Sequence, residues 1–169
     1  MAANSSDVAV VGHLSVDTIV LPTRKLPFVV LGGPTTYTSF IAKRLEASAY
    51  VISKVGASFP QAYLWWLEQE GININAVTRH QDEATTAFEL TYSQGFDNRT
   101  LKLKNKGPPL TLEDIPKDLQ AKAIHLAPID NELPYEVAEE LKKHADILSL
   151  DPQGLIRSFD EQGNVSNNG

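Results

Sequence analysis

The sequence predicts an α/β fold in which a parallel sheet carries helices on both faces and a small antiparallel β lid projects from it. Short apolar strands alternate with amphipathic helices along most of the chain, which favours right-handed βαβ crossovers and hence a parallel sheet. Residues 84–104 instead alternate every two residues on both sides of a glycine-containing turn. That period is typical of a half-exposed antiparallel hairpin.

The length and composition are those of one globular domain. The chain has 169 residues, 42% hydrophobic and 21% charged, which excludes a disordered or fibrous protein. Its net charge of −6 makes nucleic acid and anionic membranes poor partners. Because cysteine is absent, thiol chemistry and cysteine-ligated metals are excluded. There is no signal peptide and no apolar run of the ~20 residues that a membrane span needs, so we expect a cytoplasmic protein.

The first part of the chain predicts three strands and a helix. Apolar runs at residues 8–11, 18–21 and 28–31 are typical of short strands. Residues 22–27 begin and end with proline and are predicted to form a turn. A Gly-Gly-Pro sequence then precedes apolar residues at helical spacing, which predicts a helix over 34–46.

The following segment repeats the strand–helix pattern. Residues 50–53 and 74–77 are β-rich runs that we predict as strands. Between them, Ser58 can cap a helix, and Gly71 supplies the left-handed residue that ends it. The hairpin at 84–104 then forms a flap that leaves the main sheet.

The last part of the chain returns to the parallel pattern. Thr111–Asp114 resembles a capping box that opens a short helix. Residues 123–126 and 147–150 are predicted strands, with a helix beginning near Pro134 between them. From Gln162 onward the sequence is polar, and we predict no regular structure there.

Three polar features follow predicted strands, and ligands bind at that edge of open parallel sheets. Asp17 follows the first strand, and its carboxylate can accept hydrogen bonds from two neighbouring hydroxyls of a polyol. Gly32 and Gly33 precede a helix N-terminus, where backbone amides can approach a ligand oxygen. Asp151 and Gln153 follow the last strand. Each feature alone is also an ordinary turn, but together, with a flap beside them, they favour a small-molecule site.

Other residues give no functional signal. The four histidines have no metal-ligand spacing and are expected to be solvated or core residues. Trp65 and Trp66 are adjacent on one predicted helix, so one of them faces outward. The sequence has no Gly-x-Gly-x-x-Gly, P-loop or Gly-x-Ser-x-Gly motif, so none of these motifs marks a catalytic site, and the histidine spacing predicts no metal-binding residue. The histidines are His13, His80, His125 and His144.

Five segments carry a resemblance to a known family. They are Gly12–Asp17, Leu31–Tyr37, Val51–Gly56, Thr85–Tyr92 and the Asp-Pro-Gln-Gly-Leu-Ile-Arg stretch at 151–157. Over residues 8–157, they make the chain similar to the N-terminal half of the ribokinase-like (PfkB-type) carbohydrate and nucleoside kinases. The Gly-Gly pair followed by a helix is the most specific part of this resemblance.

The resemblance implies a Rossmann-like ribokinase-type sheet and ATP-dependent phosphoryl transfer to a primary alcohol of a sugar, polyol or nucleoside. In such kinases, the residue matching Asp17 binds substrate hydroxyls, and those matching Gly32 and Gly33 line the sugar site and hinge the lid. The strands matching residues 17–31 and 84–104 form that lid, which commonly makes a homodimer. A closing lid excludes water that would otherwise hydrolyse the nucleotide.

Two departures qualify this resemblance. Tyr37 stands where many members carry a sugar-reading asparagine, which suggests another substrate, such as a ring that packs against the phenol; we retain Tyr37 and Asp151 as candidate substrate-binding residues. The family's Gly-Ala-Gly-Asp motif, with its catalytic aspartate, and its Asn-x-x-Glu motif for Mg²⁺ are absent from the 169 residues. We therefore expect residues 1–169 to be the N-terminal half of the domain and inactive alone, with ATP and Mg²⁺ used by the full-length enzyme.

Two alternatives remain open. The chain could be a non-catalytic module that binds a small polyol or a nucleoside, in which case binding would show no dependence on ATP. It could also be a nucleotide-binding oxidoreductase with a pyrophosphate at Gly32 and Gly33, but its glycine spacing differs from that motif and the expected acidic residue is missing.

Overall fold

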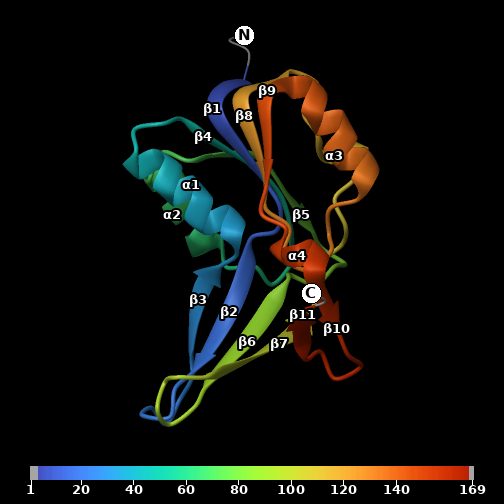
Figure 1. The fold of residues 1–169 in the computed structure, drawn as a ribbon. Helices are drawn as coiled ribbons and strands as arrows, with labels where there is room; N and C mark the ends of the chain where they lie inside the picture. Colours follow the sequence, from blue (N-terminus) through green and yellow to red (C-terminus); the bar gives the residue numbers. More distant parts are fainter. Residues whose placement is uncertain (1–3, 168–169) are drawn as a thin grey trace.

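The computed structural model describes residues 4–167 (Figure 1). Five parallel strands form the main sheet in the spatial order β5-β4-β1-β8-β9. The predicted parallel sheet is therefore confirmed. The strands are β1 (Asn4–Val11), β4 (Ala49–Gly56), β5 (Asn73–His80), β8 (Leu119–Leu126) and β9 (Ala145–Leu150).

Helices cover both faces of the main sheet, as predicted. Figure 1 shows α1 (Pro34–Arg44) and α2 (Gln61–Gln69) on one side and α3 (Tyr135–Leu141) on the other. Strand β4 shows why both faces need cover, because all its residues are buried and its side chains alternate between two cores. Tyr50 packs into the core beneath α3, whereas Val51 packs into the core beneath α1 and α2.

The helix boundaries agree with part of the prediction. Helix α1 begins at Pro34, as predicted, and ends two residues early, at Arg44. Ser58 does not cap α2: the N-cap is Pro60, whose fixed φ suits a helix start without a side-chain bond. Gly71 adopts the left-handed conformation expected after α2, with φ of 74°.

A second sheet, which we call the lid, has the order β3-β2-β6-β7. Its strands are β2 (Ser15–Val20), β3 (Phe28–Gly32), β6 (Ala87–Tyr92) and β7 (Arg99–Asn105). The predicted hairpin of residues 84–104 is present as the antiparallel pair β6–β7, and β2–β3 is also antiparallel. The central pair β2–β6 is parallel, because both strands leave the main sheet in the same direction.

The C-terminal part contains structure that the sequence did not predict. After α4 (Gln153–Ile156), strands β10 (Arg157–Phe159) and β11 (Val165–Asn167) pair antiparallel, so the expectation of no regular structure from Gln162 was wrong. Asp160 closes the turn between them by accepting hydrogen bonds from the backbone N–H groups of Gln162 and Asn164. The turn also packs on the lid through a bridge between Lys102 and Asn164.

Two short 3₁₀ helices complete the described chain. The predicted capping box opens η1 (Leu112–Asp114), since the Thr111 backbone N–H and hydroxyl both donate to the Asp114 carboxylate. The second, η2 (Lys142–His144), leads from α3 into β9. Within residues 4–167, every helix is too short or too polar to cross a bilayer.

Candidate functional site

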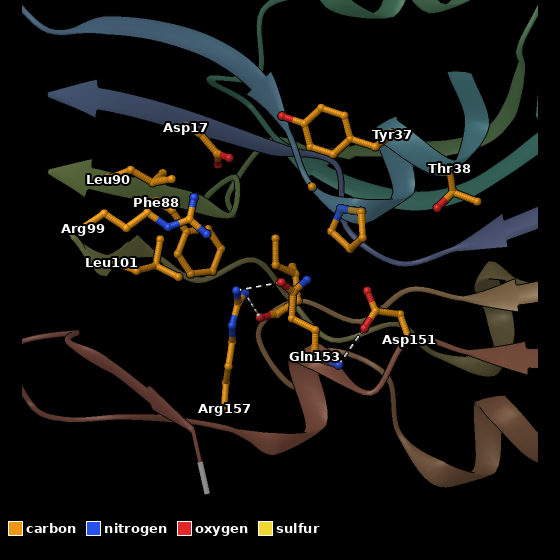
Figure 2. A pocket seen from close by; sticks show the side chains of 13 residues that line it. Asp17, Tyr37, Thr38, Phe88, Leu90, Arg99, Leu101, Asp151, Gln153 and Arg157 are labelled. Atoms are coloured by element: carbon orange, nitrogen blue, oxygen red, sulfur yellow. Dashed lines mark hydrogen bonds between the residues drawn. The ribbon is translucent and has the colours of Figure 1, made fainter. Parts of the chain in front are cut away.

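A pocket of about 420 Å³ lies where the lid meets the carboxyl edge of the main sheet (Figure 2). Phe88, Leu90 and Leu101 of the lid form its apolar wall. Four of the five predicted site residues line it, namely Asp17, Gly33, Tyr37 and Asp151, together with Gln153. The chain thus brings together groups that are more than 130 positions apart in the sequence.

Asp17 lies within β2, opposite Val30 of β3 and Phe88 of β6. It is therefore a lid residue. The sequence predicted this strand to begin at residue 18, after Asp17, but β2 begins at Ser15 and so includes Asp17. The Ser15 hydroxyl donates to one carboxylate oxygen at 2.8 Å, and in the described part of the chain it is the only hydrogen-bonding partner of that carboxylate. Burial raises the pKa of Asp17, while the Ser15 hydrogen bond and the charge of Arg157 act against the rise.

The paired glycines have different roles. Gly33 lines the pocket with φ of 91°, a conformation that strains other residues. Gly32 does not line the pocket, but a Cβ atom at this position would overlap the Asp17 carboxylate. Glycine at 32 therefore leaves room for Asp17, and glycine at 33 allows the turn from β3 into α1.

Tyr37 reaches the pocket from helix α1 and Asp151 from the end of the main-sheet strand β9. Tyr37 stands on the first turn of α1, and burial raises the pKa of its phenol, helped by the charges of Asp17 and Tyr92. Asp151 follows β9; its backbone N–H donates to Leu126 at 2.9 Å, and its carboxylate accepts a hydrogen bond from the Gln153 N–H at 2.9 Å. That turn aims the start of α4 at the pocket (Figure 2).

Two pocket residues were missed as candidates. Arg99 of β7 and Arg157 of β10 both line the pocket. Alternation in the hairpin already puts Arg99 on the same face as Leu101, so that pattern could have identified it. The position of Arg157 depends on the β10–β11 pair, which the sequence did not reveal.

A buried polar network lies beside the pocket, at the base of the lid. His13, which the sequence assigned to the core or to solvent, is fully buried. Its Nδ1 atom lies 2.7 Å from the Thr86 hydroxyl and its Nε2 atom 3.0 Å from the carbonyl oxygen of Pro108. The Thr86 hydroxyl is also 3.0 Å from the Asp130 carboxylate. The network therefore connects the start of β2, the start of β6 and the loop after β8.

Glu132 completes this network from the same loop. Its carboxylate accepts hydrogen bonds from the backbone N–H groups of His13, Ile129 and Asp130. Ligand atoms of His13, Asp130 and Glu132 lie within 4.8 Å of one another, a grouping that the sequence does not suggest because 117 positions separate His13 from Asp130. Internal hydrogen bonds occupy most of these atoms, so the network serves first to fix the backbone.

No family model matches the sequence, and no curated protein is significantly similar to it. Solved structures share its fold. A pyrophosphate-dependent kinase in the ribokinase family, solved as a sulfate complex, gives a TM-score of 0.78 at 22% identity over 95% of this chain and 55% of its own. The nucleoside kinase of Methanocaldococcus jannaschii gives 0.71 at 20% identity, over 89% of this chain and 54% of its own.

A third structure agrees with these two. The fructokinase of Halothermothrix orenii gives a TM-score of 0.71 at 21% identity, over 86% of this chain and 57% of its own. The chain thus spans about half the length of the structures that it matches. These similarities confirm the predicted ribokinase-type α/β fold.

Proposed function

We propose that the chain is the substrate-binding and lid portion of a ribokinase-like kinase that phosphorylates a hydroxyl group of a sugar, polyol or nucleoside. One observation carries the proposal: Asp17, with a single internal hydrogen-bonding partner in the described chain, faces a pocket formed by the lid and the carboxyl edge of the sheet. The kinases with this fold include a nucleoside kinase and a fructokinase, which supports this substrate class.

The pocket has the chemistry that a polyol or a nucleoside needs. The ionised Asp17 can accept hydrogen bonds from two adjacent hydroxyl groups and so orient the ring. Phe88, Leu90 and Leu101 offer an apolar wall for the C–H face of a sugar or for a base. Phosphoryl transfer requires this part of a kinase to hold the acceptor hydroxyl in one place and to keep water away from it.

The phosphoryl donor is proposed from the fold alone. ATP with Mg²⁺ is the donor that the resemblance implies, and pyrophosphate is an alternative because one kinase of the same fold depends on it. The motifs that hold the donor and the metal in such kinases are absent from the 169 residues. No residue of this chain is therefore assigned to either group, and no step is derived through them.

Calorimetric titration with a panel of sugars, inositols and nucleosides tests the proposal. We expect one class to bind saturably and Asp17→Asn to weaken that binding by about tenfold or more, because the amide offers one acceptor fewer. Asp146→Asn, at an exposed position of β9, is the matched control. A flat response to the whole panel, or unchanged binding by Asp17→Asn, would refute the proposal.

A further inference from the structure

Two arginines of the pocket have no carboxylate partner. Arg99 begins β7 and Arg157 begins β10, and both line the pocket (Figure 2). Neither forms an ion pair with an Asp or Glu side chain within residues 4–167. Arg157 is half-buried and Arg99 is exposed. The two positive charges repel each other across the pocket, and an anion bound between them would relieve that repulsion.

The partners of Arg157 are neutral and fix its direction. Its guanidinium donates to the Ile129 carbonyl oxygen at 3.1 Å and to the Gln153 side-chain oxygen at 2.8 Å. It also lies over the ring of Phe88, 5.6 Å from the ring centre. These contacts hold the planar group in place and use only part of its five N–H donors, which leaves others for a ligand.

Arg99 reinforces the positive charge at this point. Burial lowers the pKa of Arg157 and the nearby charge of Arg99 lowers it further, whereas Asp151, Asp17 and Asp130 act in the opposite direction. The one hydrogen bond of the Arg99 side chain in the described chain is a long contact of 3.4 Å to the Tyr92 hydroxyl. Arg99 is therefore free to turn towards a bound anion.

We propose that Arg99 and Arg157 form an anion subsite of the pocket, which binds a phosphate group while hydroxyls of the ligand reach Asp17. The inference rests on the proposed function and adds that the ligand of the pocket carries a negatively charged group. Guanidinium forks match the geometry of phosphate oxygens, with two parallel N–H donors to each group. Figure 2 shows Asp17 and Arg157 on different walls of the pocket, so one ligand can engage both.

The phosphate has two chemical sources. In the first alternative, the acceptor carries the phosphate, and the substrate is a phosphorylated sugar or polyol. In the second, the phosphate belongs to the phosphoryl donor that meets the acceptor in this pocket. Three probes separate these sources: myo-inositol, myo-inositol 1-phosphate and inorganic pyrophosphate. Each is titrated calorimetrically into the 169-residue chain and into its Arg99→Gln and Arg157→Gln variants, at low and high salt.

We expect each arginine substitution to weaken binding of at least one phosphate probe by about tenfold, because each removes a charge-assisted contact. High salt should weaken the same probe, while myo-inositol binding changes less than about twofold. Loss for myo-inositol 1-phosphate assigns the subsite to the acceptor, and loss for pyrophosphate alone assigns it to the donor. The control is Arg44→Gln, on α1 at a surface pair with Glu70.

The inference is overturned if neither phosphate probe binds, or if both bind the arginine variants as they bind the unaltered chain. If the Arg157→Gln variant fails to fold, the Arg99→Gln variant still decides the test. Arg99 is exposed, so the thermal unfolding temperature of the Arg99→Gln variant should equal that of the unaltered chain. The proposed function fails differently: no polyol or nucleoside binds and Asp17→Asn has no effect, whether or not pyrophosphate still depends on the arginines.

Discussion

His13 lies in surroundings that fix where its protons are. Its Nε2 faces the Pro108 carbonyl oxygen, which can only accept, so Nε2 carries a proton. The Thr86 hydroxyl accepts the Gly107 N–H and has one proton to give, which Asp130 receives. Nδ1 must then carry a proton as well, which makes His13 a cation beside the Asp130 anion, 3.5 Å away.

This pairing predicts how stability depends on pH. Burial works against the charged forms of both His13 and Asp130. The hydrogen bond and charge of Asp130, together with the charge of Glu132, nevertheless raise the pKa of His13 above its ordinary 6.5. In turn, the hydrogen bond and charge of His13 lower the pKa of Asp130 below its ordinary 3.8. Above pH 6.5, unfolded His13 loses its proton while folded His13 keeps it. The free energy of unfolding should therefore fall as pH rises through that raised pKa, by up to about 1.4 kcal/mol per pH unit.

Urea unfolding between pH 5.5 and 8.5 measures this effect. The fall in unfolding free energy should be smaller in His13→Gln, which has no titrating ring, and in Asp130→Asn, which has lost the anion. The Asp130 contribution has the opposite sense, since it is lost as the pH falls through the lowered carboxyl pKa. Identical pH slopes for the unaltered chain and both variants would contradict the ion pair.

Among single residues, strand order alone predicted part of the site. Asp151 follows a strand of the parallel sheet, as that rule expects, whereas Asp17 and Gly33 reach the same pocket from the lid strand β2 and from the end of the lid strand β3. Asp130 gave no such signal, because its role depends on a partner 117 positions away. A buried network of this kind is specified by three-dimensional contacts, and one sequence does not show them.

Among elements, the lid has two faces of different character. Asp17 and its cross-strand neighbour Val30 share the pocket face, so the adjacent Val29 lies on the outer face. Val29 is 54% exposed, and Leu26, in the turn before β3, is 75% exposed. Exposed apolar side chains at this end of the lid are suited to contact with a second copy of the lid.

We predict that the chain forms a homodimer through this face. Val29→Asp should shift the sedimentation coefficient from dimer to monomer, because a carboxylate at the interface would be buried without a partner. Ile41→Asp, at a comparably exposed apolar position on α1 (60%), is the control and should leave the dimer intact. A chain that sediments as a monomer before any substitution, or equal effects of both variants, would exclude a lid dimer.

Helices and strands with a clear periodicity of apolar residues were predicted well. Elements held together by local polar hydrogen bonds were not predicted. The alternation in residues 84–104 specified β6 and β7, and helical spacing specified α1. The pair β10–β11 has only three residues in each strand, too few for a period to show. It forms because Asp160 closes the turn and because the pair packs beside β7.

In the whole molecule, β9 is an edge strand of the main sheet and exposes Ile147 and Leu150. Such an edge favours association with further polypeptide. This feature agrees with our proposal that phosphoryl transfer needs groups outside these 169 residues.

We predict that the 169-residue chain transfers no phosphate above the buffer blank when supplied with Mg²⁺, either ATP or pyrophosphate, and the polyol or nucleoside that it binds. Asp17 is assigned to substrate binding, and Asp151 accepts the Gln153 N–H, so neither is positioned by motif to take the proton of the attacking hydroxyl. An intact kinase of the same fold with its own substrate is the positive control. Donor-dependent product that Asp17→Asn abolishes would contradict this prediction.

The buried network also determines how the lid can move. It ties the entry to β2, the entry to β6 and the exit from β7 to the loop after β8. The lid is thus held at its base by this network, whereas the two turns near residues 21–27 and 93–98 project away from the main sheet. We therefore expect the displacement of the lid to be largest at those turns, so that a ligand would enter beneath them and the size of the opening would depend on the stiffness of four short strands.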